Sequence, residues 1–160
     1  MDKEIELKLV EKYPKILRDY GKSPMESCLA FGFEFSNGWE KLIEECLEKL
    51  QYFIDLCSKD GREFDVILNQ AKEKFGSLRF YVSTYGVNDI ENDIIDDIIS
   101  EAERKSTQTC EETGEYGTIC KRGGWLKTLC RTQARELGYV ACNEETEKYW
   151  QQKDAEESKS

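Results

Sequence analysis

The longest helical pattern of apolar residues lies between Asn37 and Cys57. Its apolar positions recur three or four residues apart, as on one face of an α-helix. They are Trp39, Leu42, Ile43, Cys46, Leu47, Leu50, Phe53, Ile54 and Cys57. Asn37 followed by Glu40 has the form of a capping box, which predicts the start of the helix. We expect this helix to be the centre of the core, with Cys46 and Cys57 as small core residues.

Two stretches after this helix alternate apolar and polar residues, which is the pattern of β-strands. The apolar positions are Phe64, Val66 and Leu68 in the first stretch and Leu78, Phe80 and Val82 in the second. Gly76 lies between the two stretches and supplies a turn. The pattern therefore predicts a β-hairpin over residues 63–84.

Two further helices are predicted on either side of these elements. Residues 3–12 form a short amphipathic pattern that ends before Pro14. In residues 88–102, the apolar stripe consists of Ile90, Ile94, Ile95, Ile98 and Ala102. Asp and Glu fill most of the other positions there and repel one another four residues apart, so tertiary packing has to hold this helix.

The remaining segments carry weaker signals. Residues 28–35 are apolar with a glycine in their middle, which is typical of a buried strand or a turn. Residues 106–124 have the composition of a loop. A last helix is predicted from Trp125 to Gly138, where the glycine provides the C-terminal cap.

Together these elements predict an α+β fold. We expect a single compact domain over residues 1–142, in which a long amphipathic helix packs on a β-hairpin or small antiparallel sheet. Residues 106–139 would form a ribbon-like subregion with a C-terminal helix. The acidic residues 143–160 are expected to be a frayed or disordered tail.

The charge balance narrows the function. Acidic residues outnumber basic ones by 33 to 23, which gives a net charge of −10, and histidine is absent. Ser-His-Asp and Cys-His nucleophile systems and HExxH metalloproteases are thereby excluded, and the chain has no P-loop or Rossmann glycine pattern. An enzyme is therefore not favoured. General nucleic-acid binding is not favoured either, because it requires a basic face.

Two interpretations of the acidity stay open. A carboxylate surface with Asp93, Asp96 and Asp97 on the 88–103 helix could imitate DNA or dock on a basic protein. Alternatively, the negative charge only keeps the protein in solution. The oligomeric state also stays open.

The N-terminus and the cysteine content indicate the compartment. The first residues are charged throughout, and no apolar stretch is long enough to span a bilayer, so we expect a cytoplasmic protein without a membrane partner. The chain has seven cysteines, an odd number. We expect no disulfide framework in a reducing cytosol.

The segment from Lys121 to Arg135 is basic, although the chain as a whole is acidic. It contains five basic residues and Trp125 but no carboxylate. Two glycines before the predicted helix would direct backbone N–H groups at an anion, while a basic side chain neutralises a phosphate and Trp125 stacks on a base. The alternative is a basic helix that pairs with the acidic 88–103 helix and buries Trp125.

Lys72, Lys74 and Arg79 gather around the predicted hairpin turn, with Tyr81 on the same strand face as Arg79. This cluster could form the opposite wall of the anion site predicted around Trp125. Alternatively, its members are ordinary surface residues of the hairpin. The candidate ligand-binding residues are Lys74, Arg79, Tyr81, Arg122, Trp125, Lys127 and Arg131.

Four cysteines lie in the C-terminal part of the chain, each ten or more residues from the next: Cys110, Cys120, Cys130 and Cys142. A zinc ribbon requires two close pairs of the C-x2-C type. The positions that would complete such pairs hold Thr113 and Gln133, which are poor zinc ligands. We therefore expect no cofactor, and Cys110 and Cys130 are only weak candidates for a metal site.

Several motifs occur in an order that resembles a known family. They are Tyr13-Pro-Lys-Ile-Leu17, Gly32-Phe-Glu-Phe-Ser-Asn-Gly-Trp39, Lys72-Glu-Lys-Phe-Gly-Ser-Leu-Arg-Phe-Tyr81, Cys110-Glu-Glu-Thr-Gly114 and Gly124-Trp-Leu-Lys-Thr-Leu-Cys130, followed by Ala134 and Gly138-Tyr139. Over residues 13–139 the chain resembles a family of small proteins of tailed phages, prophages and bacteria that has no established activity.

The resemblance implies a zinc-ribbon-like C-terminal region and a role in modulating a host. This chain keeps Cys110 and Cys130, the first positions of the family's two knuckles, and has Thr113 and Gln133 at the second positions. We therefore expect a non-enzymatic phage-type binding protein that acts in the host cytoplasm against antiviral defence. Three modes stay open: sequestering a small nucleotide signal, inhibiting a host defence protein as an acidic binder or DNA mimic, and acting as a degenerate zinc-ribbon interaction module.

Overall fold

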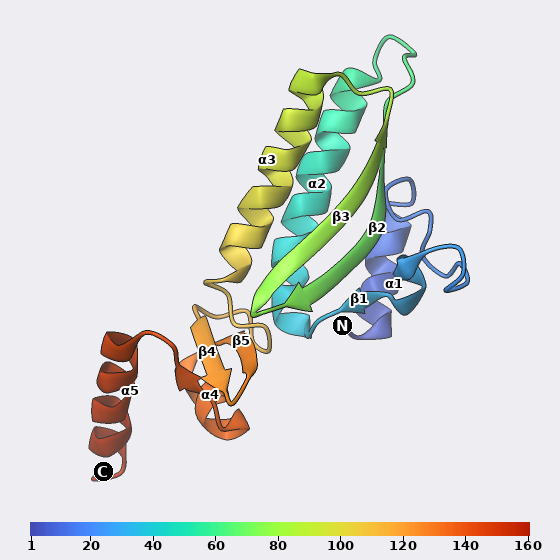
Figure 1. Cartoon of the computed structure of the whole chain (residues 1–160). Helices are drawn as coiled ribbons and strands as arrows, with labels where there is room; N and C mark the ends of the chain where they lie inside the picture. The colour runs from blue at the N-terminus through green and yellow to red at the C-terminus, as the bar shows by residue number, and fades with distance from the viewer.

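Helix α2 (Glu40–Cys57) lies at the centre of the fold, as its apolar stripe predicts. The computed structural model describes all 160 residues. In Figure 1, α2 lies beside α3 (Asp89–Ser106), and both helices cover one face of the hairpin formed by β2 (Asp65–Lys74) and β3 (Ser77–Tyr85). The fully buried side chains between these layers include Trp39, Ile43, Leu47, Leu50, Leu68, Leu78 and Ile95. The predicted α+β fold is confirmed.

The first sheet has the strand order β1-β2-β3. Strand β1 (Phe33–Glu34) runs parallel to β2, and β2 and β3 form the predicted antiparallel hairpin, closed by a turn at Phe75 and Gly76. The segment 28–35, expected to be a strand or turn, contains both: a 3₁₀ turn over Cys28–Phe31 and then β1. Helix α1 (Lys3–Lys12) confirms the N-terminal prediction.

Helix α3 covers the outer edge of β3. The N–H of Leu78 donates to Oγ of Ser106 at 2.8 Å, and the N–H of Phe80 donates to Oε1 of Glu103 at 3.1 Å. These contacts satisfy backbone groups that would otherwise be open to pairing with another chain. The helix predicted over residues 88–102 is thus confirmed, with a true capping box between Asn88 and Glu91.

The other predicted capping box, at the start of α2, was wrong. The side-chain oxygen of Asn37 accepts a hydrogen bond from the N–H of Asp2 at 2.8 Å, and it caps no helical N–H. A short 3₁₀ turn over Asn37–Trp39 leads into α2 instead. Asn37 therefore ties the N-terminus of the chain to this turn.

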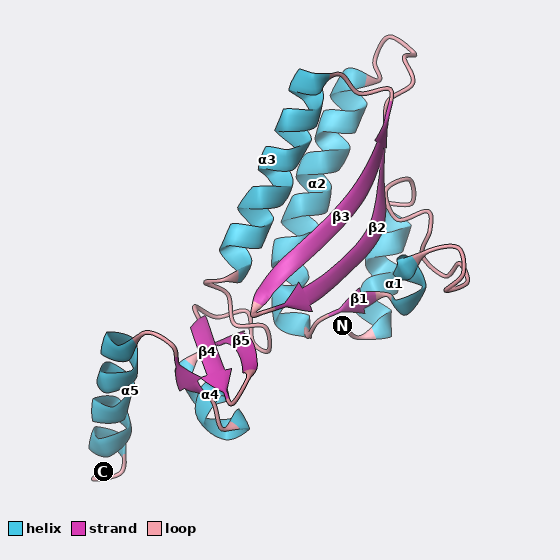
Figure 2. Cartoon of the chain, viewed as in Figure 1, coloured by secondary structure: helices cyan, strands magenta, loops and turns pink.

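The C-terminal part of the chain forms a second, smaller unit with its own core (Figure 2). Strands β4 (Thr118–Arg122), β5 (Trp125–Leu129) and β6 (Val140–Ala141) form a sheet in the order β5-β4-β6, next to helices α4 (Arg131–Leu137) and α5 (Glu144–Glu157). Eight side chains make up its core: Cys110, Cys120, Leu129, Cys130, Ala134, Tyr139, Ala141 and Trp150. No helix of either unit is long and apolar enough to cross a membrane.

The predicted helix over residues 125–138 is correct only in its second half. Gly123 and Gly124 form the turn of the β4–β5 hairpin, in which Arg122 pairs with Trp125, so the first half is strand β5. Strand β4 likewise lies in the predicted loop over residues 106–124. The helical part ends as predicted at Gly138, which has a φ of 74°.

The prediction of a frayed or disordered tail at residues 143–160 was wrong, because α5 is folded and packed. The side-chain oxygen of Asn143 accepts a hydrogen bond from the N–H of Thr146 and caps the helix. The indole of Trp150 is buried in the second core. Glu147 and Asp154 both accept hydrogen bonds from Arg135.

We expect Trp150→Ala to destabilise the second unit by about 3 kcal/mol, the usual cost of emptying a buried aromatic site. Tyr149→Ala is the matched control, because its neighbouring ring is 56% exposed against 8% for Trp150; it should change stability by less than about 0.5 kcal/mol. Urea unfolding followed by circular dichroism measures both. Equal midpoints for the two variants would contradict the packing of α5.

Candidate functional site

Three of the five basic side chains between Lys121 and Arg135 are paired with carboxylates of their own unit. Nζ of Lys127 lies 3.2 Å from Oε1 of Glu112, and Nη1 of Arg131 lies 2.9 Å from Oδ1 of Asp154. Arg131 also pairs with Glu157. The expected pairing of this segment with the acidic 88–103 helix was therefore wrong, because the loop before β4 and helix α5 supply nearer carboxylates.

Arg122 and Trp125 lie at the far end of the β4–β5 hairpin. Nη1 of Arg122 donates to the carbonyl of Leu137 at 2.7 Å, and its guanidinium lies 4.8 Å from the centre of the Tyr139 ring. Trp125 is 73% exposed, so the alternative in which it is buried was also wrong. The Gly-Gly pair beside it forms a hairpin turn and does not lead into a helix N-terminus.

The hairpin candidates lie near the tip of β2–β3. Arg79 donates to Oγ of Ser77 at 2.6 Å and to the carbonyl of Leu78 at 3.0 Å. Nζ of Lys74 lies 5.5 Å from the centre of the Phe75 ring, and Tyr81 is exposed.

The tip of this hairpin contacts strand β5. Oγ1 of Thr128 donates to the carbonyl of Gly76 at 2.6 Å. The two predicted walls of the basic site therefore meet along the backbone. Lys127 and Arg131, however, would have to give up carboxylate partners before either could bind a phosphate. Nucleotide capture stays a prediction, and no contact in the structure favours it.

Three of the four C-terminal cysteines are buried in the second core, and Cys142 is exposed. The four positions expected from a ribbon, 110, 113, 130 and 133, converge at Cys130. Burial raises the pKa of the Cys130 thiol and Cys110 raises it further, while hydrogen bonds from the Gln133 backbone and the Thr113 side chain lower it. Oγ1 of Thr113 lies 3.8 Å from the Cys130 sulfur. No group of three or more His, Cys, Asp or Glu side chains is placed to hold a metal.

This convergence predicts that two substitutions create a metal site. Thr113→Cys with Gln133→Cys would place four thiols where a tetrahedral zinc requires them. We expect the double variant to bind one zinc per chain and to melt at a higher temperature with the metal. Elemental analysis and the visible spectrum of the cobalt form measure this. The control, Thr113→Ser with Gln133→Ser, adds no thiol and should bind none. Failure of the cysteine variant to bind zinc or cobalt would contradict the ribbon-like arrangement.

The two units are joined where the 3₁₀ turn before α2 meets the segment after α3. Nε1 of Trp39 donates to the carbonyl of Thr109 at 2.8 Å, and the N–H of Gly38 donates to the carbonyl of Glu111 at 2.7 Å. A Cβ on Gly38 would lie 2.3 Å from the carbonyl oxygen of Cys110. Only glycine fits there, so the Gly-Trp pair is explained by this joint.

Glu111 is a buried charge within the joint, with 3% of its surface exposed. Its Oε1 accepts the N–H of Ser36 at 3.1 Å, and its Oε2 has no hydrogen bond but lies 3.4 Å from Nζ of Lys127. Burial raises the pKa of Glu111, and Lys127 offsets only part of that effect. For Lys127, burial lowers the pKa, but Glu111 and Glu112 raise it more, so the net pKa is raised.

Glu111 should make stability depend on pH. Its pKa in the folded state lies above the ordinary value of 4.5, so the folded protein binds this proton more tightly than the unfolded chain. The contribution of Glu111 is therefore present at low pH and is lost as pH rises through the interval above 4.5. Relative to wild type, Glu111→Gln should gain stability between about pH 4.5 and 7. Urea midpoints across this range measure the difference. The control Glu112→Gln should show no such gain, and a constant difference for Glu111→Gln would contradict the raised pKa.

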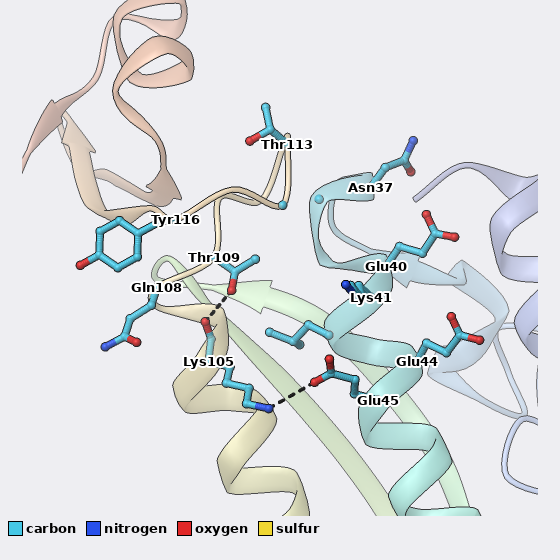
Figure 3. Close-up of a pocket in the computed structure, with 13 residues that line it drawn as sticks. Asn37, Glu40, Lys41, Glu44, Glu45, Lys105, Gln108, Thr109, Thr113 and Tyr116 are labelled. Carbon is cyan, nitrogen blue, oxygen red and sulfur yellow. Dashed lines mark hydrogen bonds and ion pairs between the residues drawn. The ribbon is translucent and has the colours of Figure 1, made fainter.

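A polar hollow of about 660 Å³ opens beside this joint, between the start of α2, the end of α3 and the following loop (Figure 3). Its wall contains acidic and basic side chains. Two of them, Lys105 and Glu45, form an ion pair in which Nζ lies 3.2 Å from Oε2. Tyr116 lies at its edge, and none of the seven predicted ligand residues lines it. Its lining contains no histidine, cysteine or serine, so it holds no Ser-His or Cys-His pair.

Four carboxylates in the first half of α3 form a group that pairs with no lysine or arginine. Asp89, Asp93, Asp96 and Asp97 are exposed, and no lysine or arginine lies within ion-pair distance of any of them. We call these four side chains the acidic face. Ile90, which is 73% exposed, and Ile94 lie among them. The second half of α3 is instead tied to α2, where Nζ of Lys49 lies 2.7 Å from Oε2 of Glu101.

A groove between α2 and α3 lies next to the acidic face. It forms a shallow hollow of about 440 Å³ lined by Glu48, Lys49, Tyr52, Phe53 and Ile98. This groove was not predicted, because the helical patterns place Phe53 and Ile98 on the sides of the helices that face the core. Both are only half-buried. Tyr52 and Leu56, apolar residues of α2 that lie outside its predicted apolar stripe, are the signal that could have revealed it.

No protein-family model, curated protein or solved structure matches the chain. The resemblance to phage proteins therefore stays an expectation from the motifs.

Proposed function

We propose that this protein is a non-enzymatic binding protein that docks on a basic partner protein through the acidic face of α3. One observation carries the proposal: three of the five cations of the basic segment, Lys127, Arg131 and Arg135, are paired with carboxylates, while the four carboxylates of the acidic face pair with no lysine or arginine. The molecule therefore presents unneutralised negative charge at a defined place. Complementary charge steers association and selects partners of the opposite sign.

The arrangement of the acidic face costs stability. Asp89, Asp93 and Asp97 follow one another at intervals of four residues, the spacing at which like charges on a helix repel. The helix dipole favours carboxylates only in the first turn, which accounts for Asp89 but not for Asp97. Buried Ile95 and Ile99 hold the helix in place despite this repulsion. A basic partner would relieve the repulsion, which supports a binding role.

Two other features of the molecule agree with a binding role. The polar hollow beside the joint holds no Ser-His or Cys-His pair, and two of the predicted ligand residues, Lys127 and Arg131, are already paired with carboxylates. The motif resemblance implies a phage setting, in which the basic partner would be a host protein and the outcome would be inhibition of its activity. Host defence proteins are the class that the resemblance favours.

Changing Asp93, Asp96 and Asp97 together to Asn should abolish capture of the partner, because it removes most of the acidic face without altering its shape. The measurement compares proteins retained from bacterial lysate by wild type and variant, quantified by mass spectrometry at low and high salt. We expect wild type to enrich basic proteins at low salt and to release them at high salt. The variant should not retain these proteins at either salt concentration.

The matched control is Glu11→Gln with Glu144→Gln and Glu145→Gln, which removes the same number of exposed carboxylates elsewhere on the surface. This control should retain the same partners as wild type. If the control and the Asp variant lost binding equally, net charge alone would explain the capture. If the Asp variant kept its partners, the acidic face would not be the binding surface.

A further inference from the structure

We infer that the groove between α2 and α3 receives the apolar face of a basic amphipathic helix from the partner protein. This inference rests on the proposed function and adds the chemistry of the occupant. The groove and the acidic face belong to one surface, because α3 supplies a wall of the first and all of the second. A partner held by the acidic face therefore lies beside an open apolar groove.

The floor of the groove is apolar and accessible. Its apolar lining consists of Tyr52 and Phe53 on α2 and Ile98 on α3, and Tyr52 is 70% exposed. One turn further along the two helices lie Leu56 and Ile94, which are 47% and 39% exposed and extend this apolar surface beyond the hollow. Their exposure leaves apolar surface without a partner inside the molecule, and such surface beside charged residues marks interaction sites.

The rim of the groove is negative. Glu48 lines it directly, and Asp93 and Asp97 lie on the exposed side of α3. The one cation in the lining, Lys49, is neutralised by Glu101 at 2.7 Å. An occupant therefore needs an apolar face flanked by lysine or arginine, and an anionic lipid surface would be repelled.

The two helices that border the groove are long enough to lie along a third helix. Helices α2 and α3 have 18 residues each, which corresponds to about 27 Å at 1.5 Å per residue. They lie side by side (Figure 1), and the shallow hollow between them, lined by Tyr52, Phe53 and Ile98, is the place where we expect the ridge of a third helix to pack. Helix-in-groove recognition places apolar anchors every three or four residues, which matches the one-turn spacing of Tyr52 and Leu56 and of Ile94 and Ile98.

The experiment uses three synthetic 18-residue peptides as probes of the full-length protein. The first has leucine and tryptophan on one helical face and lysine on the other. The second has the same composition in an order that destroys the apolar face, and the third replaces lysine with glutamate. We expect fluorescence anisotropy to show that the first binds at least about tenfold more tightly than the second. The third should not bind.

Two sets of variants separate the groove from the acidic face. Tyr52→Ser with Leu56→Ser should weaken binding of the first peptide about tenfold and leave binding of the second peptide unchanged. The matched control, Leu7→Ser with Met25→Ser, alters two exposed apolar residues elsewhere and should change neither. Changing Asp93, Asp96 and Asp97 to Asn should weaken the binding of both lysine peptides.

The outcomes distinguish this inference from the proposed function. Equal binding of the two lysine peptides, unaffected by the Tyr52 and Leu56 changes but lost with the Asp changes, would overturn the groove and leave the acidic face standing. Binding of the lysine peptides that is unaffected by the Asp changes would overturn the proposed function itself. No binding of the first peptide would overturn the groove as a site for such helices.

Discussion

The rest of the structure depends on the contact between Trp39 and the segment after α3. Trp39 is fully buried in the main core, and its indole N–H donates to the carbonyl of Thr109. One side chain thus belongs to the first core and also holds the second unit. Gly38 allows this contact, because any side chain there would collide with the carbonyl of Cys110. The placement of β5 against the hairpin tip follows from it.

Charge is divided unevenly across this joint. In the second unit, Arg135 contacts Glu147 and Asp154, and its guanidinium lies 5.6 Å from the centre of the Trp150 ring. A helix with so little apolar surface as α5 is held by these contacts together with one buried tryptophan. The basic segment is therefore part of the packing of its own unit. The four carboxylates of the acidic face on α3, by contrast, pair with no lysine or arginine.

Local sequence patterns predicted the elements that carry many apolar contacts. They failed where contacts between residues far apart in the sequence determine the structure. The apolar residues recur often enough at a fixed spacing to identify helix α2, the β2–β3 hairpin and helix α3 from the sequence. Strand β5 was mistaken for a helix, although the Gly-Gly pair before it and the alternation in Trp125–Leu129 were available as signals. The partners of the candidate site are a harder case. Arg131 and Asp154 are 23 residues apart, and no spacing rule joins them.

The two halves of α3 show how one helix serves both folding and recognition. Its second half is fixed by ion pairs to α2 and by Ser106 and Glu103 on the edge of β3. The first half is held by the buried side chain of Ile95 and by the ion pair between Glu91 and Arg62, so the acidic face needs no ion pairs of its own to keep its place. Binding to a preordered surface loses less conformational entropy than binding to a flexible one. The repulsion among the free carboxylates is then available to be relieved by a partner, which is the physical basis for a docking role.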